Sequence, residues 1–420
     1  MWLPIDPNSD FSIHNLPFGI FSTPNAPKRV GVALGDWVID MPVLTDLGAF
    51  NGIDFDKNVF RRDFLNDFMA TGKAVRVSVR QVLQQIFDDP CSPFKNHTSA
   101  FLVKQSDATL SMPVKVGDYT DFYSSEQHAF NVGAMFRGAE NALMPNWKHL
   151  PVGYHGRASS IVVSGTPFHR PKGQLCPDET QPPFFAPTKR LDIELEMATV
   201  IGTGNDLGDR IDVNQAENHV FGFLLFNDWS ARDIQRWEYV PLGPFLAKNF
   251  FSSVSPWVVT TEALASFRTD APAQSPEVLP YLQETHRQNF DVTLEVYLEK
   301  SETDKTTPTP QRSAPFLVSR SNFKHLYWTV AQQIAHHTVN GCNLNVGDLL
   351  ASGTISGPTP DSYGSFLELT WGGKNPLTLP DGTHYTFVQD YDTIIIRGFA
   401  EKEGKRVGFG EVRTTVLPAK

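Results

Sequence analysis

Alternating hydrophobic and polar residues from about residue 117 to the end of the chain predict a strand-rich domain. Successive side chains of a strand point to opposite faces, so a half-buried antiparallel strand shows this pattern. The predicted strands are 161–163, 191–201, 221–226, 292–298, 349–352, 366–371 and 393–396. One helix is predicted among them at 323–339, where Asn322 can cap the first turn and Gly341 can end the helix.

The first 118 residues predict a separate, smaller domain. Short apolar runs predict three strands, at 18–21, 29–34 and 37–41, with Gly35-Asp36 as a hairpin turn. Apolar residues three and four positions apart predict two helices, at 59–69 and 75–86. We therefore expect a small β-barrel with a helical annex over residues 1–118 and a larger domain over 119–420.

Two segments show neither the strand spacing nor the helix spacing of apolar residues, and we expect them to project from the packed body of the protein. Residues 170–189 are rich in proline, which interrupts regular structure. Residues 303–313 are a Thr/Pro/Gln stretch, for which we expect a mobile surface loop.

Composition and charge narrow the class of protein. The chain has 420 residues and is 40% hydrophobic, which is enough for a packed interior and argues against disorder. Its 36 basic and 46 acidic residues give a formal net charge of -10. Phosphate backbones repel such a chain, so nucleic-acid binding is disfavoured, and an anionic substrate would need locally placed Arg or Lys.

No feature of the sequence predicts export or a membrane partner. The first residues lack the basic start and apolar run of a signal peptide, and no stretch approaches the ~18 apolar residues of a membrane span. Cys91, Cys176 and Cys342 lie far apart without CxxC spacing, so we expect neither a disulfide framework nor a thiolate zinc site. The expected location is the cytosol.

The most informative stretch is 190–197, where apolar and acidic residues alternate. On a strand, one face would carry Leu191, Ile193, Leu195 and Met197, and the other Asp192, Glu194 and Glu196. Neighbouring carboxylates on one face, about 7 Å apart, repel each other unless cations lie between them. A charged strand face in contact with water is the alternative, and for an isolated strand it would be favoured.

Two further acidic residues favour a cation site. Asp228 follows the apolar run 221–226, and Asp121 precedes a predicted helix start. An all-oxygen set of carboxylates suits a hard cation, Ca²⁺ or Mg²⁺, better than zinc or copper. Spacing alone does not bring these residues together, so the metal site is a hypothesis at this level.

His128 is a candidate general base. Ser124 with Gln127 three residues later is a capping-box pattern, which places His128 in the first turns of a helix. Neutral imidazole suits proton removal from water near pH 7, and a carboxylate commonly orients it. Glu368, on the polar face of the predicted strand 366–371, is a candidate partner. A histidine that only hydrogen-bonds a neighbour is the alternative.

Hydrogen-bond donors are predicted near the middle of the chain. A helix capped at Ser230 would place Arg232, Gln235 and Tyr239 on one face. Guanidinium, amide and phenol groups suit carboxylate or carbonyl oxygens, although an ordinary solvated face is the alternative. Lys248 lies in an apolar run, so we expect its charge to be paired.

Several motifs together resemble the signatures of the fumarylacetoacetase family. They are Asp121-Phe122-Tyr123-Ser124-Ser125, His149-Leu150-Pro151-Val152-Gly153-Tyr154-His155-Gly156-Arg157, Asn227-Asp228-Trp229-Ser230-Ala231-Arg232-Asp233, Val339-Asn340-Gly341-Cys342-Asn343-Leu344 and Ala351-Ser352-Gly353-Thr354-Ile355-Ser356-Gly357. The likeness covers nearly the whole chain. It implies a mainly β (α+β) fold, in which a small SH3-like N-terminal barrel joins a large mixed β-roll in a homodimer.

The resemblance also implies a role for each candidate residue. Calcium ligands would be Asp121, Glu194, Glu196 and Asp228. His128, oriented by Glu368, would accept a proton, and the oxyanion site would consist of Arg232, Gln235 and Lys248. Substrate contacts would be Tyr123, Arg137, Tyr154, Gln235, Tyr239 and Thr354. A second small-cation site, for which Mg²⁺ is the candidate, would involve Asp228, Lys248 and Ser252, but Phe251 here replaces the glycine of the family.

The implied activity is hydrolysis of the carbon–carbon bond of fumarylacetoacetate to fumarate and acetoacetate, the last step of tyrosine and phenylalanine breakdown. The His–Glu dyad would activate water, the donors would hold the oxyanion, and the divalent ion would hold the enolate leaving group. Two alternatives stay open: a related diketo-acid hydrolase or oxaloacetate-type decarboxylase on the same scaffold, and a non-catalytic calcium-binding protein. A two-carboxylate glycosidase is disfavoured, since neighbours on one strand cannot flank a glycosidic bond.

Overall fold

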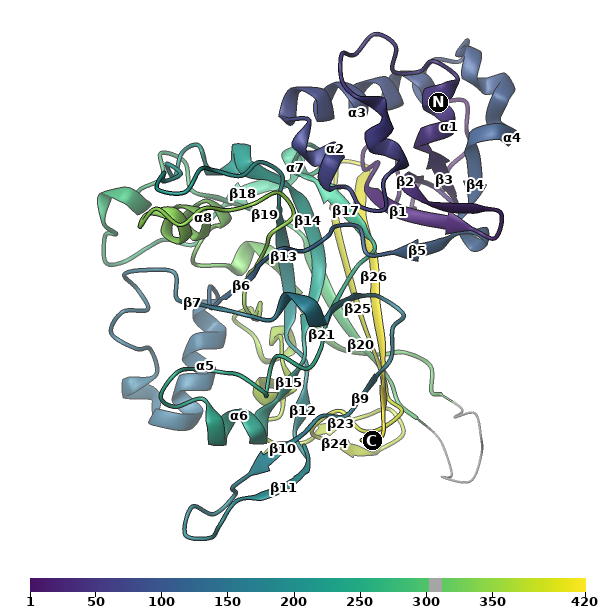
Figure 1. Ribbon diagram of the computed structural model, residues 1–420. Coiled ribbons are helices and arrows are strands. Elements are labelled where there is room, and N and C mark those ends of the chain that lie inside the picture. The colour runs from purple at the N-terminus through teal and green to yellow at the C-terminus, as the bar shows by residue number, and fades with distance from the viewer. Residues whose placement is uncertain (302–311) are drawn as a thin grey trace.

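A large mixed sheet of thirteen strands forms the body of the protein in the computed structural model, which describes residues 1–301 and 312–420 (Figure 1). Its central strands are β13 (Leu195–Ile201), β14 (Val220–Asp228), β16 (Ser252–Val254), β17 (Trp257–Thr260) and β22 (Leu349–Ala351). The outer strands of this part are β6 (Tyr119–Phe122), β7 (Gly153–His155) and β8 (Ile161–Val163). Every residue of β13 and β14 is buried, which explains their nearly continuous apolar runs.

The N-terminal strands extend this sheet at one end, where β1 pairs with β17 through Phe18 and Val258. They are β1 (Phe18–Thr23), β2 (Ala26–Leu34), β3 (Trp37–Asp40), β4 (Leu102–Lys104) and β5 (Thr109–Ser111). The helices of the small domain are α1 (Met41–Asp46), α2 (Asn66–Ala70), α3 (Lys73–Asp88) and α4 (Thr98–Phe101). The three expected strands and the helix at 75–86 are therefore confirmed.

The expected helix at 59–69 is wrong as a continuous element. A short 3₁₀ turn at Lys57–Arg61 and α2 occupy its ends, and the chain between them is extended at Arg62. Arg61, Arg62 and Asp63 are exposed. These charged residues favour water over the continuation of a buried helical face.

A second, five-stranded sheet packs against the large one. Its strands are β9 (Phe168–His169), β20 (Thr293–Glu299), β21 (Phe316–Asn322), β25 (Thr393–Lys402) and β26 (Lys405–Leu417). Gly398 lies where the sheets approach closely, because a Cβ atom there would come within 2.6 Å of Leu225 Cδ2. The mainly β architecture with a small N-terminal domain is confirmed, whereas the boundary at residue 118 stays a prediction.

In the C-terminal half of the chain, two predicted elements differ from the structure. The helix at 323–339 is divided into a 3₁₀ turn, Phe323–His325, and α8 (Val330–Thr338). Asn322 caps only the turn, whereas Thr329 and Gln332 form the capping box that starts α8. The segment 366–371 is not a strand: it contains the short helix α9 (Phe366–Leu369), capped by Ser365.

The remaining elements are short. The helices are α5 (Glu126–Arg137), α6 (Arg232–Glu238) and α7 (Thr261–Leu264). The small two-stranded pairs are β12 (Leu191–Asp192) with β15 (Ser230–Ala231), β18 (Arg268–Asp270) with β19 (Gln288–Phe290), and β23 (Leu377–Thr378) with β24 (His384–Tyr385). Among the described residues, none of the helices has the length and apolar character needed to cross a membrane.

The two expected excursions have different outcomes. The proline-rich segment 170–189 contains the projecting hairpin of β10 (Lys172–Leu175) and β11 (Phe184–Pro187), so it is partly ordered as strand (Figure 1). The loop expected at 303–313 falls for most of its length on residues 302–311, which lie outside the described residues.

Candidate active site

Four carboxylates from three neighbouring strands meet in the interior. They belong to Asp121 in β6, Glu194 just before β13, Glu196 in β13 and Asp228 at the end of β14. One ligand oxygen from each lies within 4.8 Å of the others, and every one of these residues is at most 6% exposed. The acidic face therefore does not meet water, and the solvated-strand alternative is wrong.

Strand pairing explains why residues so distant in sequence meet here. The antiparallel pair β13 and β14 places Leu195 opposite Asn227, so Glu194 and Asp228 lie at one end of the pair. β22 pairs antiparallel with β13 and parallel with β6, where Ala351 lies opposite Asp121. Strand β22 thus brings Asp121 to the side of Glu196.

Two cations neutralise this cluster unevenly. Lys248 Nζ lies 2.6 Å from Glu194 and 2.8 Å from Asp228, and Arg232 Nη1 lies 2.7 Å from Glu194. Burial acts to raise the pKa of Glu194, but Lys248 and Arg232 outweigh it and the pKa falls below its usual range. The expectation that Lys248 is paired is confirmed.

Asp121 and Glu196 have no ion pair with a cationic side chain among the described residues. Burial and the neighbouring Asp228 charge hold the pKa of Asp121 well above its ordinary value, and burial with Asp121 and Glu194 does the same for Glu196. Asp121 Oδ1 and Glu196 Oε1 are buried without a hydrogen-bond partner among the described residues. Unpaired buried carboxylate oxygens are costly, so this donor set fits a hard divalent cation.

A buried histidine–glutamate pair lies beside the cluster. His128, in the first turn of α5, has Nδ1 2.7 Å from Glu368 Oε2, and the helix starts at Ser125, whose side chain accepts from the His128 amide. Ser125 rather than Ser124 is thus the cap. The Ser124 hydroxyl is engaged elsewhere, where it accepts a hydrogen bond from Gln333.

The surroundings of Glu368 fix the protonation of this pair. Its carboxylate accepts additional hydrogen bonds from Asn131, Ser356 and Ser365 at 2.8–3.0 Å. Burial acts to raise the pKa of Glu368, but the charge and hydrogen bond of His128 outweigh it and the pKa is lowered. Ionised Glu368 can only accept, so Nδ1 carries a proton in either charge state of the imidazole, and in the neutral ring the free lone pair is on Nε2. The only hydrogen bond of the His128 ring within the described part of the chain is that of Nδ1 to Glu368.

The predicted donors lie on α6, although the helix starts differently from the prediction. It begins after Ala231 without a side-chain cap, because the Ser230 hydroxyl donates to Glu194 instead. Arg232 is buried, and its Nη2 has no partner among the residues that the structure describes. Gln235 accepts from Arg232 Nη1 at 3.3 Å through Oε1, which leaves its amide N–H groups free to donate.

The predicted substrate contacts divide into two groups. Tyr123 packs edge-on against His128, Tyr154 donates to Asp228 at 3.2 Å, and Thr354 has a buried hydroxyl without a partner among the described residues. Tyr123 and Tyr154 thus contact His128 and Asp228 directly, whereas no hydrogen bond among the described residues joins the Thr354 side chain to either. Arg137 and Tyr239 are exposed, and the Arg137 guanidinium donates to the carbonyls of Asn141 and Ala142.

At the predicted second cation site, the Ser252 hydroxyl donates to Asp228 Oδ1 at 2.7 Å. Phe251, the residue that replaces the glycine of the family, is buried and stacks on Phe168 with ring centroids 4.4 Å apart. Its ring is therefore directed into the core beside Phe168.

Four residues for which no role was predicted support the site by hydrogen bonds: Asp192, Asn131, Ser356 and Ser365. Of these four, only Asp192 could have been found from the sequence, because alternation placed it on the same predicted strand face as Glu194 and Glu196. The other three surround Glu368, and nothing in their spacing indicates it.

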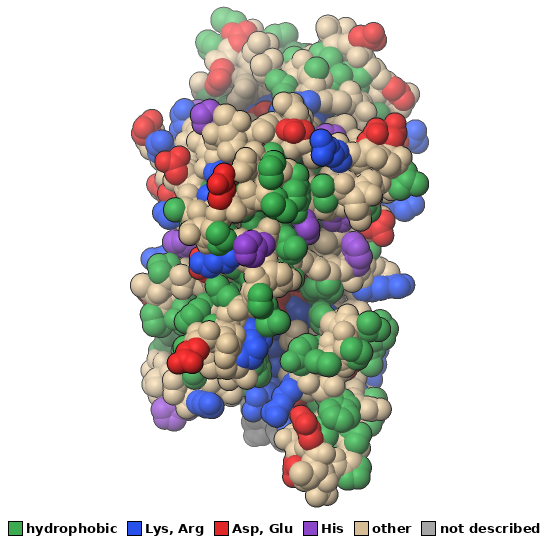
Figure 2. Space-filling model, turned by 90° about the vertical axis from the view of Figure 1, so that its left-hand side faces the viewer, with side chains coloured by type: hydrophobic (Ala, Val, Ile, Leu, Met, Phe, Trp, Pro, Cys, Tyr) green, Lys and Arg blue, Asp and Glu red, His purple; other side chains and the backbone are tan. Residues whose placement is uncertain are grey.

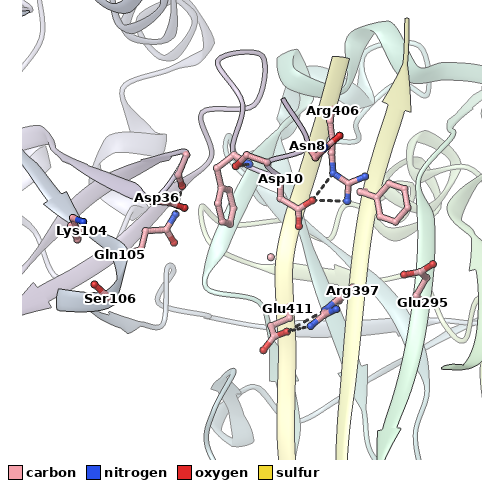
Figure 3. A pocket seen from close by; sticks show the side chains of 15 residues that line it. Asn8, Asp10, Asp36, Lys104, Gln105, Ser106, Glu295, Arg397, Arg406 and Glu411 are labelled. Atoms are coloured by element: carbon pink, nitrogen blue, oxygen red, sulfur yellow. Dashed lines mark hydrogen bonds and ion pairs between the residues drawn. The ribbon is translucent and has the colours of Figure 1, made fainter. Parts of the chain in front are cut away.

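Hollows are present on the described part of the surface. Figure 2 shows the side that carries α5 and α6, where Lys and Arg side chains gather in a hollow with hydrophobic side chains along its edges. A hollow of about 800 Å³ lies elsewhere, between the N-terminal domain and the β25–β26 pair (Figure 3). Its arginines are already engaged, Arg406 with Asp10 at 2.8 Å and Arg397 with Glu411 at 3.1 Å. With its arginines engaged, this hollow is a weaker candidate for catalysis than the buried cluster.

Comparison with protein families gives two matches that together span most of the chain. Residues 14–113 match the family described as fumarylacetoacetase N-terminal, and residues 118–417 match fumarylacetoacetate (FAA) hydrolase C-terminal. The chain is 50% identical to the fumarylacetoacetase of Homo sapiens over 422 residues, covering 100% of this chain and 99% of that protein. It is 48% identical to the fumarylacetoacetase of Arabidopsis thaliana, covering 100% and 98%.

Solved structures share the fold at much lower identity. A fumarylacetoacetate hydrolase from Exiguobacterium antarcticum has a TM-score of 0.53 at 17% identity, covering 96% of this chain and all of that one. A maleylpyruvate hydrolase from Sphingobium has a TM-score of 0.50 at 16% identity, with the same coverage.

Proposed function

The chain belongs to the fumarylacetoacetase family, and from this membership and the site we propose that it hydrolyses fumarylacetoacetate to fumarate and acetoacetate. It is a hydrolase that acts on a carbon–carbon bond. The observation that carries the proposal is a buried imidazole with a free Nε2 beside four clustered carboxylates and an unpaired Arg232 Nη2. This arrangement joins a base for water, a cation site and an oxyanion donor, the three elements that hydrolysis of a 1,3-diketone needs.

The chain's own residues account for the proton transfers. His128 Nε2 takes a proton from water as its oxygen bonds to the carbonyl carbon, while Glu368 stabilises the imidazolium. In this proposal Arg232 Nη2, the Gln235 amide and Lys248 donate to the negative oxygen of the adduct. When the carbon–carbon bond breaks, its electron pair leaves on the acetoacetate fragment, and the proton held by His128 returns to that fragment.

We assign the cation site to Asp121, Glu194, Glu196 and Asp228. A divalent cation bound there supplies a Lewis acid for the diketo oxygens of the substrate. Separations of up to 4.8 Å between ligand oxygens are about twice a Ca–O distance of ~2.4 Å, whereas Mg²⁺ would need a closer set, so we propose Ca²⁺. For a second cation, as Mg²⁺ near Lys248 and Ser252, the support is weaker, since both side chains already contact Asp228.

Two further expectations belong to this proposal. All three cysteines, Cys91, Cys176 and Cys342, are free, which supports a reducing compartment such as the cytosol. Exposed apolar side chains, among them Phe185 at 70% and Leu242 at 97%, support a homodimer, since a monomer would leave them in water. Sedimentation equilibrium of the purified chain tests the dimer.

The decisive experiment is cleavage of fumarylacetoacetate, followed by loss of its absorbance and by identification of both products. Fumarate and acetoacetate in equal amounts support the proposal, whereas release of CO₂ would indicate a decarboxylase. The assay is repeated after treatment with a chelator and after return of Ca²⁺ or Mg²⁺. Cleavage that is insensitive to the chelator would contradict the role of the cation.

A further inference from the structure

A buried carboxylate outside the cation cluster joins two parts of the candidate site. Asp192, in β12, is fully buried. Its oxygens accept hydrogen bonds from Arg232 Nε at 2.8 Å and from the backbone N–H groups of Phe366 and Leu367 at 2.7 and 3.0 Å. One side chain therefore contacts both the donor helix α6 and the helix α9, which carries Glu368.

On the α9 side, Asp192 anchors a helix that is too short to be stable alone. The first N–H groups of a helix have no partner within it. Asp192 accepts two of them, and Ser365 Oγ accepts the next, from Glu368, at 3.3 Å. Since α9 has only four residues, this anchor sets the position of Glu368 relative to His128.

On the α6 side, Asp192 fixes the plane of a guanidinium. Arg232 donates from Nε to Asp192 and from Nη1 to Glu194, so two edges of its fork are engaged. Only Nη2 is left without a partner among the described residues, and its direction follows from the other two contacts. Displacement of the Asp192 oxygen would rotate the donor away from the reacting oxygen.

We propose that Asp192 is a positioning residue, which holds the His128–Glu368 pair and the Arg232 guanidinium in one fixed relative orientation. This inference rests on the proposed function, since it takes Arg232 as the oxyanion donor and His128 as the base. Asp192 acts through these groups and needs no contact with substrate. Its loss should therefore lower kcat more than it changes KM, since misplacement of about 1 Å can reduce a rate about 100-fold.

The test compares Asp192→Asn with a matched variant, Asp40→Asn. Asn at 192 turns an N–H₂ group toward Arg232 Nε or the α9 amides, all of which are donors. Asp40, in the N-terminal domain, is also buried, accepts from Arg29 Nε at 2.8 Å and accepts from the first turn of α1. We expect Asp192→Asn to lower kcat about 10–100-fold with KM within about 3-fold, and to keep its thermal shift with Ca²⁺. Asp40→Asn should lower Tm and leave kcat unchanged.

Two further measurements keep the inference open to refutation. Asp192→Glu retains the negative charge but moves the carboxylate oxygens, so its kcat should also be lower than that of the wild type. This variant provides the test if Asp192→Asn does not fold. In a Glu368→Gln background, Asp192→Asn should cost less than it does alone, because both act on one unit. If the wild type is active and both Asp192 variants have a kcat within about 2-fold of the wild-type value, this inference is wrong while the proposed function stands. A wild type that does not cleave fumarylacetoacetate overturns the proposed function and this inference together.

Discussion

His128 Nδ1 lies 2.7 Å from Glu368 Oε2, and the two residues are 240 positions apart in sequence. Replacement of His128 by Ala removes the proton acceptor but leaves the cation ligands in place. We expect kcat to fall about 10²–10⁴-fold while Ca²⁺ still raises Tm. Stopped assays at several pH values, with calorimetry of the same samples, give both readouts. Turnover close to that of the wild type would remove His128 from the mechanism.

Gln235 offers a test of the oxyanion site that disturbs little else. Gln235→Glu keeps the oxygen opposite Arg232 but replaces the amide donor with a second oxygen. We expect kcat to fall about 10²–10³-fold, as for the loss of one oxyanion donor elsewhere. Arg236→Ala, on the exposed side of the same helix, is the control and should retain full activity. Equal activity of the two variants would argue against a donor role for Gln235.

The cation cluster predicts a stability effect that is independent of catalysis. Glu196→Gln replaces a carboxyl whose charged form is disfavoured by burial and by the charges of Asp121 and Glu194, so the metal-free variant should be more stable than metal-free wild type by about 1–3 kcal/mol. It should also lose most of the stabilisation that Ca²⁺ gives the wild type. Thermal unfolding with and without Ca²⁺ measures both effects, with the exposed Asp63→Asn as a control. An undiminished calcium shift in Glu196→Gln would exclude this residue as a ligand.

The raised pKa of the Glu284 carboxyl should make the stability of the protein depend on pH. Burial raises its pKa to about 7, although Thr329 donates to it at 2.5 Å. Because the folded-state pKa lies above the unfolded value, the folded protein binds the proton more tightly, and stability from this group is lost as pH rises from about 4.5 to about 7. Glu284→Gln should gain about 1–2 kcal/mol relative to wild type at pH 8 and little at pH 4.5.

Urea unfolding of both proteins at these two pH values measures the difference. Glu277→Gln is the matched control, since Glu277 is an exposed glutamate seven residues earlier in the chain. A difference that does not depend on pH would mean that the Glu284 carboxyl has an ordinary pKa.

Replacement of Phe251 by a small residue should weaken core packing. Its ring is buried and stacked on Phe168, so Phe251→Ala should lower the free energy of unfolding by about 3–5 kcal/mol. Leu207→Ala should change it by less than about 0.5 kcal/mol, because Leu207 is 81% exposed. Denaturant titration compares the two. A small effect at Phe251 would mean that the surrounding core collapses into the space.

Local patterns predicted the parts of the site that depend on a single segment. Alternation over 191–197 placed Leu191 and Ile193 in the core, where both are fully buried, and put Glu194 and Glu196 on one face, although the single strand predicted at 191–201 is interrupted at 193–194 between β12 and β13. It could not show whether that face meets water, because the answer depends on Asp121 and on pairing of β6 with β22. The physical limit is that strand partners are chosen across the whole chain.

The segment around Glu368 shows a different limit. The alternation of apolar and polar residues at 366–371 fits a strand, but for so short a run the period does not separate strand from helix. The helix is selected by acceptors for its first amides: Ser365 is local, whereas Asp192 lies 174 positions earlier. The shift of the α5 cap from Ser124 to Ser125 has the same origin, since Gln333 engages Ser124.

The junction of β6 with β22 has a consequence for synthesis of the protein on the ribosome. Asp118 donates to Asp348, 230 residues later, and Asp121 pairs with Ala351 in the same junction. At about 5–20 residues per second, β6 must wait roughly 10–50 s for this partner to be made. During that time the nascent chain exposes an unpaired strand edge, so its yield of folded enzyme should depend on chaperones and on translation speed more than that of a protein built from local contacts.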